Sequence, residues 1–175
     1  MGGVIAQNTR CYNPEFVGDT ADEPRKCESI DPNAKKTIII DDKLGSPALL
    51  SNLGNGSYAY TNFIVNTDLV LDKDASFYHC SFLVQEGVQI SVGIGKKAEF
   101  AFCHLYGCKK MWKGISVSPK STLGLHFNLI EDAQYAVLAK FASTLYINSN
   151  KFNRNYIGLY LSPSKKPVDN LSFVV

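Results

Sequence analysis

A repeat of 22 to 25 residues runs through the second part of this chain and excludes most folds. One series of apolar residues, spaced by 23, 23 and 22, marks the first strand expected in each unit: Phe77, Phe100, Leu123 and Leu145. Two places later in each unit come His79, Phe102, Leu125 and Ile147. A second series is spaced by 25, 22 and 22: Ile90, Ile115, Val137 and Leu159. Two series that share a period predict stacked copies of one supersecondary unit.

The bends repeat together with the strands. The segment LGLHFNLIEDAQYAVLA begins at Leu123, and a near copy, LYINSNKFNRNYIGLYL, begins 22 residues later. Asn128 and Asn150 hold equivalent places in the two copies, and Ile130 and Phe152 follow them at the same distance. Asparagine tolerates left-handed backbone at a bend, and stacked amides can bond to one another. We therefore expect successive coils to lie in register.

These short strands predict an all-β fold. The 9 Tyr and 10 Phe residues favour pleated strands, and no long segment has the apolar period of a helix. We predict a right-handed parallel β-helix, a solenoid of 22–25 residues per coil with an irregular N-terminal cap. A leucine-rich repeat and a β-sandwich remain alternatives, although the first needs helical return segments where this chain has YAVLA and YIGLYL.

The sequence divides into three regions. Residues 1–10 form a flexible N-terminus or the remnant of an export signal, since Val4 and Ala6 precede Gln7 as small residues precede a cleavage site. Residues 11–57 form an irregular N-terminal cap region, which contains one strand-like segment, TIIID. Residues 58–175 form the coils, which we expect to continue beyond the fragment.

The five cysteines belong to two groups. Cys11 and Cys27 flank a stretch rich in proline and acidic residues, and in an exported protein we predict a disulfide that closes this loop. In a reducing compartment both would be free thiols. The remaining cysteines lie in strand-like surroundings, where small core residues are expected: Cys80, Cys103 and Cys108.

Charge and motif spacing argue against several functions. The net charge of +2 arises from 18 basic and 16 acidic residues, a balance that does not favour nucleic acid as a partner. No apolar run is long enough for a membrane span. Glu131 and Asp132 are adjacent at a bend, where side chains diverge into solvent, and Arg154 is expected at another surface bend. We therefore predict no catalytic residue, no metal site and no cofactor.

An outward column of the first sheet is the predicted ligand-binding surface. By the spacing of the first series, Tyr78, Ala101, Gly124 and Tyr146 stack in one column, with small residues between two tyrosines. A sugar ring could stack in such a shallow trough. Trp112, which lies among lysines, is the third candidate ligand-binding residue.

Three segments resemble secreted right-handed β-helix repeat surface proteins of Bacteroidota: HLYGCKKMWKGISV, LIEDAQYAV and NKFNRNYIGLYL. The resemblance covers roughly residues 62–161. It implies an exported surface component that uses the type IX pathway and a C-terminal sorting domain. It also implies that the chain is an N-terminal fragment.

Together these patterns predict a secreted or cell-surface β-helix with a structural or adhesive role in the surface or a filament, and without enzymatic activity. The expected partners are further coils or copies that join its C-terminal coil, and surface glycans. The alternative is a carbohydrate-binding or carbohydrate-active domain, similar to polysaccharide lyases and glycosidases.

Overall fold

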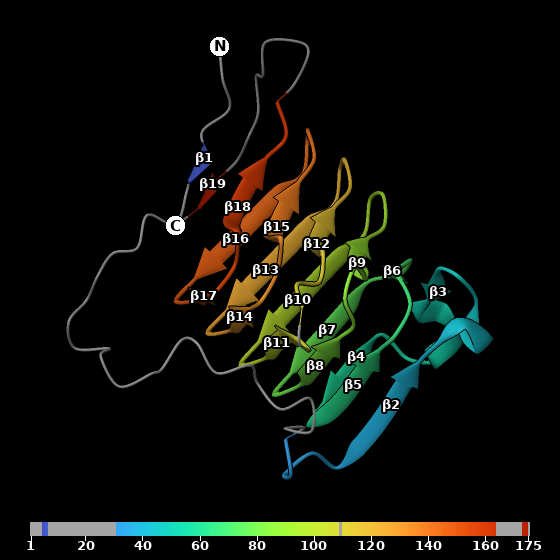
Figure 1. Cartoon of the computed structure of the whole chain (residues 1–175). Helices are drawn as coiled ribbons and strands as arrows, with labels where there is room; N and C mark the ends of the chain where they lie inside the picture. Colours follow the sequence, from blue (N-terminus) through green and yellow to red (C-terminus); the bar gives the residue numbers. More distant parts are fainter. Residues whose placement is uncertain (1–4, 7–30, 109, 164–172, 175) are drawn as a thin grey trace, which may run out of the picture.

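The computed structural model describes residues 5–6, 31–108, 110–163 and 173–174. In this part of the chain, strands stack into a parallel β-helix of about six turns, as predicted (Figure 1). Each turn contributes strands to three sheets, here called A, B and C. All strand pairs are parallel except β1 with β18, which is antiparallel. No helix in these residues is long and apolar enough to cross a membrane.

Sheet A contains, in spatial order, β1 (Ile5–Ala6), β18 (Ile157–Leu161), β15 (Tyr135–Ala139), β12 (Gly114–Val117), β9 (Gln89–Val92), β6 (Leu69–Leu71) and β3 (Ala48–Leu49). Sheet B contains β17 (Lys151–Asn153), β14 (Leu129–Glu131), β11 (His104–Gly107), β8 (Ser81–Val84), β5 (Thr61–Val65) and β2 (Lys36–Ile40). Sheet C contains β19 (Phe173–Val174), β16 (Thr144–Asn148), β13 (Thr122–His126), β10 (Lys97–Ala101), β7 (Ala75–Tyr78) and β4 (Ser57–Ala59). Two short 3-10 helices, η2 (Asp42–Leu44) and η3 (Leu50–Leu53), lie in the first turn.

The predicted second series of stacked residues is confirmed. Ile115 pairs with Ile90 and Val137, and Val137 pairs with Leu159. At the bends, Asn150 stacks on Asn128 with direct amide contact. The coils therefore lie in register on sheet A and at the corner that follows sheet C.

In the predicted first series, one pairing is shifted by two residues. Phe100 pairs with Leu125 instead of Leu123, although all three lie on sheet C. The reason lies between sheets B and A, where residues 108–113 connect β11 to β12 but only residues 85–88 connect β8 to β9. The longer connection lengthens this one coil, so only the step from β10 to β13 is displaced, whereas Phe77 with Phe100 and Leu123 with Leu145 pair as predicted.

The solenoid also begins earlier than predicted. β2 pairs with β5, β3 with β6 and β4 with β7, so the cap region assigned to residues 11–57 contains most of the first turn. The sequence period missed this turn because its spacing is irregular. Phe63 pairs with Phe82, only 19 residues later.

Inward columns form a continuous apolar core. In the early turns the core is aromatic: Phe63 stacks on Phe82 with ring centroids 4.5 Å apart, and Phe77 stacks on Phe100 at 4.7 Å. Later turns replace these rings with aliphatic side chains such as Leu125, which is fully buried. Aromatic pairs contribute about 0.5–1.5 kcal/mol beyond their buried area, so the core stabilises the alignment of the early coils.

Gly114 permits the close approach of two coils at the start of β12. Its φ is 106°, a left-handed value that disfavours other residues. A Cβ at this position would overlap the carbonyl oxygen of Tyr135 in the next coil. The position therefore requires glycine.

Candidate functional site

Four aromatic residues mark the corner where the chain leaves sheet C and enters sheet B. Tyr60, His79, Phe102 and Phe127 occupy equivalent places after β4, β7, β10 and β13. Each has a positive φ, between 49° and 56°. Left-handed backbone costs about 1–2 kcal/mol at residues other than glycine, and here it turns the chain sharply while directing the side chains outward. We call these four residues the aromatic corner.

The rings of the aromatic corner form one stack. Tyr60 and His79 are 5.2 Å apart, His79 and Phe102 5.0 Å, and Phe102 and Phe127 5.1 Å, with interplanar angles of 2°, 9° and 6°. These separations follow the strand spacing of about 4.8 Å, so the stack is a direct result of in-register coils. At the first end, the Lys35 ammonium lies 5.1 Å from the centroid of Tyr60.

Among the described residues, the other end of the stack is Phe127. Phe127 is 52% exposed. The next corner position holds Ser149, which also has a positive φ but carries no ring. Within the described part of the chain, no further ring stacks on Phe127. Phe127 can therefore act as a stacking platform for a ligand.

Tyr78, a predicted site residue, belongs to the same surface. It is 45% exposed, and its ring meets Tyr60, His79 and Phe102 edge-on at centroid distances of 6.1, 4.4 and 5.7 Å. The repeat spacing aligned His79 and Phe102 with Leu125 and Ile147 in one series, so the aromatic corner was missed. The available signal was an aromatic residue directly before Cys or Asn in successive units: HC, FC and FN.

Tyr146, another predicted site residue, lies on the same face of sheet C but in a different column. It is 43% exposed and pairs with Gly124, which in turn pairs with Glu99. The predicted column from Tyr78 to Tyr146 is therefore wrong, owing to the two-residue shift described above. Gly124 is itself buried, so it leaves no open trough beside Tyr146.

Trp112 is not available to a ligand. Its side chain is fully buried, and its indole Nε1 donates a hydrogen bond of 2.8 Å to the Glu131 carbonyl oxygen. The residue forms a parallel bridge with Ala133 in the next coil. The longer connection between β11 and β12 thus directs the indole into the core.

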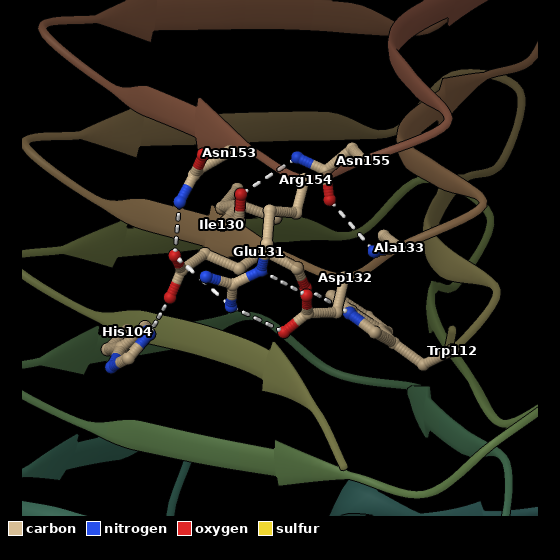
Figure 2. A network of polar contacts seen from close by, with 9 residues as sticks. All are labelled: His104, Trp112, Ile130, Glu131, Asp132, Ala133, Asn153, Arg154 and Asn155. Carbon is tan, nitrogen blue, oxygen red and sulfur yellow. Dashed lines mark hydrogen bonds and ion pairs between the residues drawn. The ribbon is translucent and has the colours of Figure 1, made fainter. Parts of the chain in front are cut away.

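A buried carboxylate connects three coils on sheet B (Figure 2). The side chain of Glu131 is 1% exposed. Its Oε2 lies 2.7 Å from His104 Nε2, and its Oε1 accepts a hydrogen bond of 2.7 Å from Asn153 Nδ2. Arg154 lies 3.5 Å from the same carboxylate and binds both oxygens of Asp132, at 2.7 and 3.0 Å. The prediction that these acids are solvated bend residues is wrong for Glu131. Its side chain is buried in a network that connects β11, β14 and β17.

Asparagine amides connect the same coils at the corners. The Asn128 Oδ1 atom accepts from the Cys103 N–H at 2.8 Å, and its Nδ2 donates to the Phe100 carbonyl and to Asn150 Oδ1, both at 2.9 Å. Asn128 is 2% exposed, so its side chain replaces water for two buried backbone groups, the Cys103 N–H and the Phe100 carbonyl.

A shallow groove lies on the outer face of sheet C, next to β4, β7 and β10. Its volume is about 210 Å³, and its lining includes Asp74, Lys97 and Glu99. The Lys97 ammonium lies 2.7 Å from Glu99, while Asp74 accepts a hydrogen bond from the Lys97 backbone N–H at 2.9 Å. The hydrogen bond and the charge of Glu99 raise the pKa of Lys97. Two carboxylates therefore share one accessible groove.

Among the described residues, no group of three His, Cys, Asp or Glu side chains could hold a metal ion.

The cysteines have different environments. Cys80 and Cys103 are buried free thiols. The hydrogen bond with the Cys80 thiol, together with burial, raises the pKa of Cys103 well above its usual range. The prediction of small core residues is confirmed for Cys80 and Cys103 but is wrong for Cys108, which is disulfide-bonded and only partly buried. The predicted pair, Cys11 and Cys27, lies outside the described residues.

Comparison with protein-family models, with curated proteins and with solved structures found no significant match to this chain. The resemblance to surface proteins of Bacteroidota, and the export route that it implies, therefore stay predictions.

Proposed function

We propose that this protein is an extracellular, non-catalytic adhesive β-helix that binds glycans through the aromatic corner and the neighbouring face of sheet C. The exposed ring stack, which among the described residues ends at Phe127, is the observation that supports this function. Sugars present apolar C–H faces and polar hydroxyl rims, and protein sites match them with aromatic platforms beside a few polar groups.

The polar groups needed for such a site are near the platform. His126 and Asn148 follow Ala101 in the outward column that starts at Tyr78, so they lie between the Phe127 corner and the Tyr146 column. Asn148 is exposed and His126 is partly exposed. Imidazole and amide groups both hydrogen-bond hydroxyls, which suits a glycan better than a purely apolar partner.

The scaffold is suited to binding without rearrangement. Each corner ring is held by its neighbours and by left-handed backbone, so little side-chain freedom remains to be lost on binding. The networks around Glu131 and Asn128 join successive coils by hydrogen bonds, which favours a stiff solenoid. Stiffness and a preformed binding surface are the properties that an adhesin requires.

Binding to a panel of immobilised polysaccharides tests this function. We expect Phe127→Ala and Tyr78→Ala each to weaken binding by at least about tenfold, because each removes an exposed ring of the surface. Tyr156→Ala is the matched control, since Tyr156 is 72% exposed but lies between β17 and β18 on the way to sheet A. The proposal fails if the wild type binds no glycan, or if the corner variants bind as well as the control.

An extracellular location is supported by the disulfide at Cys108, because disulfides persist mainly in oxidising compartments. Peptide mapping of the unreduced protein, alkylated at isolation from its own cells, tests the location and the connectivity together. A peptide pair containing Cys11 and Cys27 would confirm the predicted bridge. A pair joining Cys108 to either of them would replace that bridge, and five free thiols would contradict the proposed location.

Self-association through the ends of the solenoid is a further part of the proposal. β2 and β17 are the outer strands of sheet B among the described residues, and outer strands present unpaired backbone groups. Sedimentation over a range of concentrations tests this expectation. A monomer at all concentrations would contradict it.

A carbohydrate-active enzyme is the second candidate, favoured by Asp74 and Glu99 in one groove. Paired carboxylates are the usual catalytic groups of glycoside hydrolysis. Release of reducing ends or unsaturated products from the bound polysaccharide would support this candidate if Asp74→Asn and Glu99→Gln abolish it. Binding without any product favours the adhesin.

A further inference from the structure

Cys80 and Cys103 occupy the same position in successive coils, directly behind the aromatic corner. Register on both sides fixes this alignment, since Tyr78 pairs with Ala101 before them and Ser81 pairs with His104 after them. Backbone hydrogen bonds hold the two corners together. The His79 N–H donates to the Ala101 carbonyl at 3.0 Å, and the His104 N–H donates to the Cys80 carbonyl at 2.9 Å.

This alignment satisfies the main geometric condition for a disulfide. Neighbouring strands are about 4.8 Å apart, and disulfides join residues whose Cα atoms are about 4.4–6.8 Å apart. The two thiols face the same interior column, because Cys80 Sγ lies 3.5 Å from the Tyr78 carbonyl oxygen and Cys103 Sγ lies 3.4 Å from the Ala101 carbonyl oxygen.

We propose that Cys80 and Cys103 form an intramolecular disulfide, which cross-links two successive coils, when the chain folds in the presence of a disulfide oxidant. In the reaction, one cysteine thiolate attacks the oxidant disulfide and releases one thiol. The second cysteine then attacks the mixed disulfide and releases the other thiol. Two protein thiols are thus oxidised to one disulfide, while one oxidant disulfide is reduced to two thiols.

Burial determines when this cross-link forms. Cys80 is 1% exposed and Cys103 is 2% exposed, so an oxidant cannot reach either sulfur in the closed solenoid. The hydrogen bond between the two thiols raises the pKa of Cys103 and lowers the pKa of Cys80, so Cys80 is the thiol that attacks the oxidant when the corner is open. We therefore expect the disulfide to form during folding, before the corner closes, and a chain that folds reduced to keep both thiols. Once formed, the cross-link is equally protected from reductants.

The cross-link changes stability in a measurable way. It closes one coil of chain, and loops of this size lower the equilibrium constant for unfolding by roughly a hundredfold. Because Cys80 follows His79 and Cys103 follows Phe102, it also fixes two residues of the aromatic corner against each other. The inference does not depend on glycan binding.

Refolding of the full chain tests the inference. Protein unfolded in denaturant and reductant is refolded in a buffer of oxidised and reduced glutathione, alkylated, digested and mapped by mass spectrometry. We expect a peptide pair joining Cys80 to Cys103 that disappears on reduction after unfolding. We also expect a higher urea midpoint than that of wild type refolded under reducing conditions.

Cys103→Ala cannot form this cross-link, so it is the control for disulfides that the other cysteines form. The difference in midpoint between oxidised and reduced protein should be larger in wild type than in Cys103→Ala, because only wild type can form this cross-link. Recovery of Cys80 and Cys103 as alkylated thiols, or linkage of either to another cysteine, would overturn the inference. So would a wild-type difference no larger than that of the variant.

Discussion

Asn128→Ala should destabilise the solenoid more than any surface substitution. The side chain makes three hydrogen bonds, to the Cys103 N–H, the Phe100 carbonyl and the Asn150 amide. Each contributes about 0.5–1.5 kcal/mol, for a total of about 3 kcal/mol. The total rises to about 5 kcal/mol if the buried Cys103 N–H finds no other acceptor. This is a large part of the roughly 5–15 kcal/mol by which domains are stable.

Urea unfolding followed by circular dichroism measures the effect. With a slope of about 2 kcal/mol per molar urea, a loss of about 3 kcal/mol lowers the midpoint by about 1.5 M. Hydrogen exchange should show the largest loss of protection in β13, β14 and β16, because a solenoid transmits stability only between neighbouring coils. Asn148→Ala is the control, since this amide is exposed and should change stability by less than about 0.5 kcal/mol. A midpoint for Asn128→Ala within 0.5 M of wild type, taken as roughly 1 kcal/mol, would refute the reasoning.

Three further substitutions test other parts of the scaffold. Gly114→Ala should cost at least about 3 kcal/mol in urea unfolding, because a Cβ would overlap the backbone of the next coil at a left-handed φ; a fully stable variant would contradict this. Glu131→Gln should cost about 3 kcal/mol in urea unfolding, because it breaks a buried ionic network. Glu99→Gln, at a surface ion pair, should cost less than about 0.5 kcal/mol. Equal losses in the two variants would show that burial of Glu131 does not determine the cost. Burial acts to raise the pKa of Asp72, but hydrogen bonds from Ser51 and from its own backbone N–H, together with the charge of Lys73, outweigh it and lower the pKa. A lowered carboxyl pKa adds stability above the unfolded-state value of about 3.9, and this contribution is lost as pH falls through the folded-state value. Asp72→Asn should therefore be less stable than wild type at neutral pH and equal to it at about pH 2, as measured by urea midpoints over this range; a difference that does not change with pH would contradict the assignment.

The coil repeat could be predicted because stacking imposes it on the sequence. Ile90, Ile115, Val137 and Leu159 must all be apolar, since each covers the residue in the coil below. The asparagines at positions 128 and 150 repeat for the same reason. The register error on sheet C arose because a connection outside the sheet can lengthen one coil without changing its strand pattern.

The site was less predictable than the fold. Tyr78 and Tyr146 were found from strand alternation, and both are exposed on sheet C. The exposure of Phe102 and the burial of Trp112 were not predicted. A corner residue points outward or inward according to its φ and to the length of the adjacent connection. Neither property has a local sequence pattern of its own.

By itself, the sequence favoured a parallel solenoid over its rivals and identified the core columns with a regular spacing, such as Ile90, Ile115 and Val137, since period and polarity reflect in-register stacking. Only the tertiary structure decided which aromatic rings meet at the corner, that Glu131 is buried among His104, Asn153 and Arg154, and that Cys80 lies against Cys103. Those contacts join residues that are 19 to 27 positions apart in the sequence. A shift of two residues in the register of one coil is enough to give each residue a different partner.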